Sequence, residues 1–277
     1  MSGEVTITVL VDNRAQSGLE SEHGLSLWIE TPEKRILFDT GQNGALEKNA
    51  AKLKIDISTA DAIVLSHGHY DHCGGLPFAV RVASSATVYC QFEAVLSRYA
   101  IKNGAAVPVH MSQESKSALE GLPQARLRWV TGHELLCPNV HLTGTIARAA
   151  GSIGLGWPFY LDAAATRIDP IQDDMALWID TPRGLVVILG CCHAGLSNTL
   201  EHIRKFSPEK KIHCLAGGMH LMNSGESEIR KAISILNAYS LEFLAPLHCT
   251  GKLALDMLST AFGAKVHAGH AGMRIEV

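Results

Sequence analysis

The sequence lacks the features that assign a chain to a membrane or to a nucleic acid. None of its apolar runs reaches the roughly eighteen residues that a transmembrane helix needs, so we expect no bilayer span. Residues 1–5 lack a basic region followed by an apolar stretch, so the sequence predicts no signal peptide. The formal net charge is only −3, which gives no electrostatic reason to expect nucleic acid or an anionic membrane as a partner.

Disulfides and two common catalytic motifs are also not expected. The seven cysteines are an odd number and have no export signal before them, so we expect reduced thiols and a cytoplasmic protein. The chain has no Gly-x-Ser-x-Gly nucleophile elbow and no phosphate-binding loop, which leaves a metal ion to carry any chemistry. With 47% hydrophobic and 18% charged residues among 277, the composition is that of a soluble globular protein with a substantial core.

Three histidines and an aspartate crowd into residues 66–75, which read Ser-His-Gly-His-Tyr-Asp-His-Cys-Gly-Gly. An apolar run precedes them and predicts a strand that delivers His67 and His69 to a loop, where both can face one ion. Asp71 and His72 then open the next segment, close enough to serve a second ion. A cluster of surface or helix-capping histidines is the alternative, but groups this crowded behind a buried strand would repel each other or stay unsatisfied without a cation. Imidazole and carboxylate ligands favour zinc, with manganese or iron as alternatives.

This window resembles the metal-binding signature of the metallo-β-lactamase fold superfamily. Residues 38–41 (Phe-Asp-Thr-Gly) resemble its upstream Asp-Thr-Gly element, and residues 246–251 (Pro-Leu-His-Cys-Thr-Gly) resemble its late histidine element. The resemblance therefore covers nearly the whole chain. It implies an α/β protein, a four-layer αββα sandwich, with one or two divalent metal ions at one edge.

Further segments resemble one branch of that superfamily, and these are residues 10–13, 22–26, 190–195 and 217–221. The branch includes 7,8-dihydropterin-6-methyl-4-(β-D-ribofuranosyl)aminobenzene-5′-phosphate synthases, which have a pterin-condensing activity. The resemblance implies that the metal could act on a pterin-type substrate, although a fold alone does not fix an activity.

Two later histidines are the candidates that complete the metal site. His193 follows a predicted strand, and we expect it to join His67 and His69. His248 precedes a strand-to-helix turn, and we expect it to join Asp71 and His72 at a second ion. A structural or helix-capping histidine is the alternative for each.

The chain departs from the usual superfamily pattern at two positions. The third histidine of that pattern normally precedes the hairpin of the second half, where this sequence has Asp173 and Asp174. A bridging aspartate normally follows the hairpin, and here that position is closest to Cys191. The ligand order and the existence of a bridging carboxylate therefore stay open. We expect Asp39 to orient a metal-bound histidine or the ligand loop instead of binding metal directly.

Other polar residues have two interpretations each. His220, after two glycines, either contacts substrate as a general acid or is a structural histidine. His23 either lines the mouth of the site or is structural. Asn13 and Arg14 either bind a phosphate or a pterin edge, or lie on the surface.

The order of predicted elements suggests two similar halves within residues 1–277, read as one domain. Strands are predicted at 5–11, 25–29, 35–38, 62–65, 87–89, 176–180, 185–189, 213–216, 243–246 and 272–277, and helices at 44–53, 93–101, 196–206, 226–239 and 252–262. The less regular stretch 105–170 is either a surface loop or a lid, in which Trp157 would stack on a flat substrate.

A metal held mainly by neutral imidazoles lowers the pKa of bound water toward about 7. The sequence thus predicts a metal-dependent enzyme acting on a small-molecule ester, phosphoester or pterin, with Asp71 orienting the water or relaying its proton and His220 as a second catalytic candidate. The alternative is a metal-binding or redox-sensing protein without turnover. A homo-oligomer is compatible with either.

Overall fold

The computed structural model describes residues 5–149 and 158–277. The proposed stacking residue Trp157 lies outside the described residues, as do its neighbours from 150 onward. The hypothesis of an aromatic lid at that residue therefore stays a prediction.

Two twisted sheets form the centre of the described residues. The first has the order β17-β1-β2-β3-β4-β5-β8, with β1 (Thr6–Val11), β2 (Ser26–Glu30), β3 (Arg35–Phe38), β4 (Ala62–Val64), β5 (Thr87–Cys90), β8 (Leu127–Trp129) and β17 (Arg274–Glu276). The second has the order β16-β15-β14-β13-β10-β9, with β9 (Glu134–Cys137), β10 (Val140–Leu142), β13 (Leu177–Thr181), β14 (Gly184–Leu189), β15 (Ile212–Gly218) and β16 (Phe243–Leu247).

Each sheet runs from an antiparallel hairpin into parallel strands, as the similar halves of the sequence predict. In the first sheet the hairpin β2–β3 continues into parallel β4 and β5, and in the second β13–β14 continues into parallel β15 and β16. The carboxyl ends of these parallel strands are where loops carry polar side chains.

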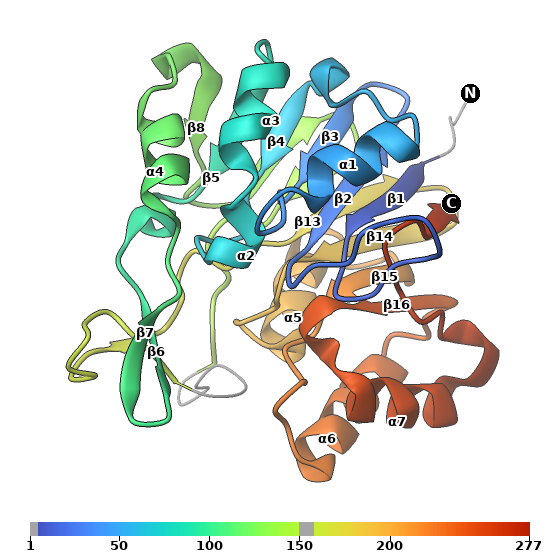
Figure 1. Cartoon of the computed structure of the whole chain (residues 1–277). Coiled ribbons are helices and arrows are strands. Elements are labelled where there is room, and N and C mark those ends of the chain that lie inside the picture. The colour runs from blue at the N-terminus through green and yellow to red at the C-terminus, as the bar shows by residue number, and fades with distance from the viewer. Residues whose placement is uncertain (1–4, 150–157) are drawn as a thin grey trace.

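Helices cover the outer face of each sheet, which gives the four layers that the resemblance implies (Figure 1). The first sheet carries α1 (Ala45–Lys52), α3 (Leu76–Val82) and α4 (Gln113–Glu120), and the second carries α5 (Leu196–Phe206), α6 (Glu226–Asn237) and α7 (Lys252–Phe262). Side chains of β14 alternate between two cores: Val186 and Ile188 pack between the sheets, whereas Val187 and Leu189 pack under the helices. The predicted αββα sandwich is confirmed.

A small third sheet corrects one prediction. The predicted helix 93–101 is wrong: a short turn, η2 (Phe92–Val95), leads into strand β6 (Tyr99–Lys102). This strand forms a hairpin with β7 (Ala105–Pro108) through Asn103 and Gly104, which have φ angles of 53° and 76°. Two central residues with positive φ make the type of turn that Asn-Gly favours, and this local signal outweighs the helical spacing of the apolar residues.

The stretch 105–170 is divided between the layers. It supplies α4, β8, β9 and β10 to the main sandwich, and β7, β11 (Phe159–Tyr160) and β12 (Ile168–Asp169) to the small sheet, whose order is β12-β11-β6-β7. The β6–β7 hairpin projects from the sandwich at the lower left of Figure 1. Whether this sheet moves as a lid stays a prediction.

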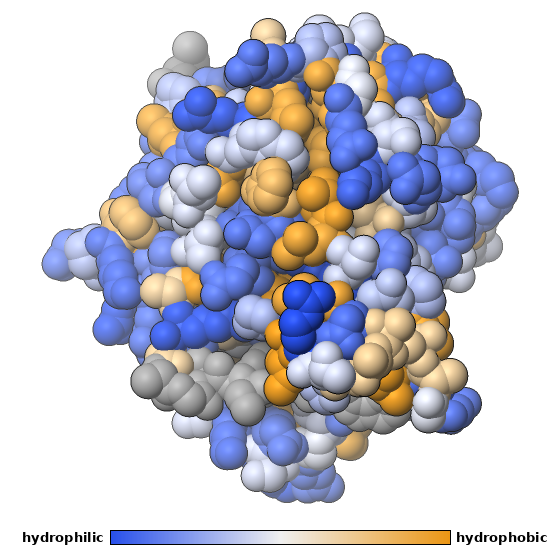
Figure 2. All heavy atoms as spheres, turned by 90° about the vertical axis from the view of Figure 1, so that its left-hand side faces the viewer, coloured by the Kyte–Doolittle hydropathy of each residue, from blue (hydrophilic) through white to orange (hydrophobic). Residues whose placement is uncertain are grey.

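The surface is mixed in character. No helix of the described residues is both long enough and apolar enough to cross a bilayer. Figure 2 shows hydrophobic residues reaching the surface in an interrupted band among hydrophilic ones. Two of the large exposed apolar side chains, Phe92 and Trp129, pair edge to face with ring centroids 5.5 Å apart.

Candidate metal centre

Strand ends from both sheets deliver the predicted ligands to one place. The loop after β4 carries the histidine-rich motif and leads into the short helix α2 (Tyr70–Cys73), the loop after β14 carries His193, and the turn after β16 carries His248. The structure brings together all six residues predicted to bind metal, and all six are buried: His67, His69, Asp71, His72, His193 and His248.

The first group of donors consists of three histidines. His67 Nε2 lies 3.0 Å from His69 Nδ1 and 3.2 Å from His193 Nε2. A tetrahedral zinc ion, with Zn–N bonds of about 2.0–2.1 Å, would hold its ligand nitrogens roughly 3.3–3.4 Å apart. Burial lowers the pKa of each of these imidazoles well below its usual value, so they are neutral at pH 7, which is the form that binds metal.

The second group lies beside the first. His248 Nε2 is 3.2 Å from His72 Nε2 and 3.3 Å from Asp71 Oδ2. Burial tends to raise the pKa of Asp71, but the positive charge available on His72 and hydrogen bonds from His23 and His248 hold it well below its usual value. The carboxylate is therefore ionised, as a metal ligand must be.

Cys191 lies between the two groups. Its Sγ is 3.1 Å from His72 Nε2, and it falls within 4.8 Å of donor atoms of His67 and His72 on one side and of His193 and His220 on another. The sequence left this position open, and the structure places a sulfur there. No other carboxylate than that of Asp71 belongs to these donor groups within residues 5–149 and 158–277.

A chain of hydrogen bonds fixes the orientation of two of the histidines. Asp39 Oδ2 lies 2.7 Å from His72 Nδ1 and accepts a hydrogen bond from the hydroxyl of Ser66 at 2.7 Å. That hydroxyl is also 2.9 Å from His67 Nδ1. With Nδ1 engaged in each ring, Nε2 faces the centre. Asp39 thus lies in the orienting position predicted for it, whereas Ser66 was not identified from the sequence.

His248 is oriented in the same way from the first strand. Its Nδ1 lies 2.9 Å from Asn13 Oδ1, and its backbone N–H donates to Asp12 Oδ1 at 2.6 Å. Asn13 was considered for binding a phosphate or a pterin edge. In the structure its side chain is engaged with the candidate ligand instead.

The two aspartates before the hairpin of the second half hold loops. The backbone N–H of Gly68 donates to Asp173 Oδ2 at 2.8 Å, and that of Ala194 donates to Asp174 Oδ2 at 2.8 Å. Burial raises the pKa of Asp174 to about 6. Neither carboxylate reaches the donor groups, so the pre-hairpin position does not take the place of the third histidine.

Arg98, which was not identified from the sequence, anchors Asp173. Its side chain is fully buried and binds Asp173 through Nη1 at 2.9 Å and through Nη2, while Nε donates to Asp169 at 2.7 Å. Arg98 precedes β6 and Asp169 lies in β12, so this ion triad joins the small sheet to the loop of His67 and His69. A spacing rule cannot find such a residue, because its partners lie about seventy positions away.

A pocket of about 490 Å³ opens onto both donor groups. Phe159 from the small sheet packs against His69 with ring centroids 4.7 Å apart, and His23 and Tyr70 contribute to the lining. His220 also lines it: its ring centroid is 4.3 Å from that of His193, and its buried Nδ1 has no hydrogen-bond partner among the described residues. A larger cavity of about 660 Å³ lies at the hairpin turns around Pro32 and Pro182, and none of the six predicted ligands lines it.

Comparison with known proteins agrees with this geometry. The sequence model of the metallo-β-lactamase superfamily matches residues 21–188. The chain belongs to this superfamily. Metal ions are typical of the superfamily, and the donor set fits them, because neutral imidazoles, a carboxylate and a thiol converge with nitrogen separations close to those around a single ion.

Within the superfamily, the chain is similar over nearly its whole length to the following three proteins. It is 31% identical to an uncharacterized protein of Methanocaldococcus jannaschii, covering 91% of this chain and 93% of that one. It is 28% identical to the 7,8-dihydropterin-6-methyl-4-(β-D-ribofuranosyl)-aminobenzene-5′-phosphate synthase of the same organism, covering 92% and 90%. The crystal structure of Tm1679, described as a metal-dependent hydrolase of the β-lactamase superfamily, superposes with a TM-score of 0.85 at 32% identity over 99% of both chains.

Proposed function

We propose that the protein is a metal-dependent hydrolase that cleaves a small ester or phosphoester, with one or two divalent ions bound by His67, His69 and His193 and by Asp71, His72 and His248. The observation that carries this proposal is that two adjacent groups of donors open into one pocket. The description of Tm1679 as a metal-dependent hydrolase supports the same reaction class. Zinc is the first choice of ion, with manganese and iron as alternatives.

The metal, when bound, supplies Lewis acidity and a water activated at neutral pH. The residues of the chain supply the rest. The ionised Asp71, held by His23 at 3.1 Å, is placed to orient the attacking water or to accept its proton. His220 lines the same pocket beside His193 and is placed to donate a proton to the leaving group. Phe159 of the small sheet packs against His69 and lines one side of the pocket.

A pterin-linked transfer is the second candidate reaction. It is supported by the 28% identity to the dihydropterin synthase over most of both chains. The ring of Phe159 in the pocket lining could pack against a flat heterocycle. In either case the partner is a small molecule in the cytoplasm, and a non-catalytic metal-binding or redox-sensing role is the remaining alternative.

Elemental analysis of the purified protein, together with turnover assays, tests the proposal. We expect at least one zinc, manganese or iron per chain, and loss of metal in His67→Ala. The control is His267→Ala, which should keep its metal, because the ring of His267 stacks on Phe243 and is not among the predicted ligands. Generic ester, phosphodiester and dihydropterin substrates would then be assayed with each metal. Full metal content in His67→Ala would refute the site, and inertness of every substrate with metal fully bound would favour the non-catalytic alternative.

A further inference from the structure

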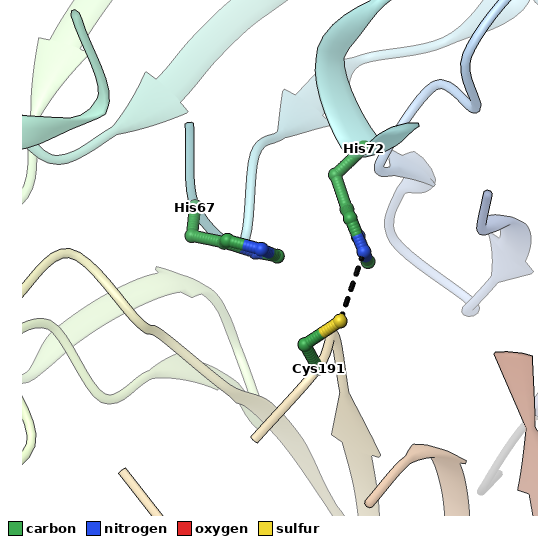
Figure 3. Close-up of side chains that lie close together, drawn as sticks. All are labelled: His67, His72 and Cys191. Carbon is green, nitrogen blue, oxygen red and sulfur yellow. Dashed lines mark hydrogen bonds between the residues drawn. The ribbon is translucent and has the colours of Figure 1, made fainter. Parts of the chain in front are cut away.

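The side chain of Cys191 occupies the space shared by the two donor groups. Figure 3 shows His67 reaching in from the loop after β4, His72 from α2 and Cys191 from the end of β14, with the three side chains directed at a common point. The sulfur is 3.1 Å from His72 Nε2 and forms candidate metal sites with His67 and His72, with His193 and His220, and with His248 and Cys249. It is thus within reach of donors that belong to both ions.

The backbone around Cys191 is built to direct this sulfur inward. Gly190 precedes it, and a Cβ at Gly190 would lie 2.1 Å from the hydroxyl of Ser66, so the two loops can approach closely only with glycine there. Cys192 follows with a φ angle of 61°, a left-handed conformation that is unfavourable for a side chain with a Cβ. This conformation turns Cys192 away, toward Thr199 and the core under α5, while Cys191 faces the centre.

The other nearby thiol is placed differently. Cys249 Sγ donates to the carbonyl oxygen of Cys191 at 3.6 Å and accepts the backbone N–H of His220 at 3.3 Å. It joins a candidate metal group only together with Cys191 and His248, on the side of the second ion. Cys249 is therefore engaged with the backbone and with the side chains of Cys191 and His220, whereas Cys191 is the sulfur that reaches donors of both groups.

We propose that Cys191 is the ligand shared by the two metal ions, a bridging thiolate at the position where the superfamily pattern has a bridging aspartate. This inference rests on the proposed function, because it requires that the site holds metal. Binding forms metal–sulfur bonds and breaks the S–H bond, and the proton leaves to solvent. A thiolate is a softer ligand than a carboxylate, so the site favours zinc and cobalt(II) over manganese and magnesium.

Cobalt(II) makes the sulfur ligand visible. Metal-free protein would be titrated with cobalt(II), and the near-ultraviolet sulfur-to-cobalt charge-transfer band would be recorded together with the metal content. We expect the band in the wild type and in the controls Cys249→Ser and Cys192→Ser. We expect it to disappear in Cys191→Ser and in Cys191→Asp, the second of which restores a bridging carboxylate and keeps two ions bound.

The outcomes separate this inference from the proposed function. A band that survives in both Cys191 variants, or that disappears in Cys249→Ser, would overturn the assignment of Cys191. Two bound cobalt ions without any band in the wild type would overturn the bridging thiolate and leave the proposed function standing. Failure of the wild type to bind metal would remove both.

X-ray absorption of the zinc-loaded wild type gives an answer that does not depend on the folding of any variant. A zinc–sulfur distance of about 2.3 Å is expected beside the zinc–nitrogen shell at about 2.0–2.1 Å. A ligand shell made only of nitrogen and oxygen would refute the proposal.

Discussion

Replacing Arg98 by methionine should destabilise the fold and loosen the metal site together. The guanidinium is fully buried and neutralises two carboxylates, those of Asp169 and Asp173. Asp173 in turn accepts the backbone N–H of Gly68, which lies between the candidate ligands His67 and His69. Methionine retains much of the apolar stem but removes all the donors, so the change tests the charge and the hydrogen bonds more than the packing.

The expected loss of stability depends on the two carboxylates that stay buried in Arg98→Met. Removing one partner of a buried ion pair typically costs about 3–5 kcal/mol, because an uncompensated charge stays buried. Here both carboxylates keep one backbone donor each, from Ile171 to Asp169 and from Gly68 to Asp173. We therefore expect Arg98→Met to lower the free energy of unfolding by about 3 kcal/mol, near the lower end of that range. The matched control is Arg128→Met. The ion pair between Arg128 and Glu134 lies at the surface and should contribute only about 0–1 kcal/mol to stability.

Urea unfolding of the metal-free variants measures the loss of folding stability, and competition with a chelator measures zinc affinity. Arg98→Lys should recover part of the stability, since it restores the charge without the planar fork. Adding Asp173→Asn to Arg98→Met should also recover part, because it removes one uncompensated charge. A loss no larger than that of Arg128→Met would refute the energetic reasoning. Unchanged zinc affinity despite the expected loss of stability would refute the connection to the metal loop.

Three further predictions concern the centre itself. Because burial lowers the pKa values of His67, His69 and His193, the unfolded chain takes up protons below its usual histidine pKa of about 6.5 while the folded chain does not. The metal-free protein should therefore lose stability as the pH falls below about 6.5, since these three outnumber the one histidine of the site whose pKa is raised; an unchanged Tm between pH 7.5 and 5.5 would contradict this. Asp39→Ala should lower zinc affinity about 10–100-fold by freeing the ring that it orients, and wild-type affinity in a chelator competition would argue against that role. His220→Asn should lower kcat by about 10²–10⁴-fold with metal content unchanged, whereas wild-type kcat would exclude it as the proton donor.

Local patterns predicted those parts of the fold that depend on short stretches of sequence. The helices at 196–206 and 252–262 occur with the predicted ends, because an amphipathic period repeats over several turns there. The strand before His67 was predicted from an apolar run that both cores bury. The predicted helix at 93–101 does not form, although its apolar residues have helical spacing. Asn103 and Gly104 form a hairpin turn, and the Arg98 side chain binds buried carboxylates.

The local sequence predicted a metal site at His67, His69 and His72, because these residues are neighbours in the chain and their proximity needs no fold. It also determined the layered α/β fold, through strand and helix periods that are local. The residues that support and adjoin the predicted ligands are visible only in three dimensions: Cys191 reaches His72 across 119 positions, Asn13 reaches His248 across 235, and Arg98 reaches Asp173 across 75. Such contacts depend on where two sheets bring their strand ends together, and no spacing within a single segment encodes that distance.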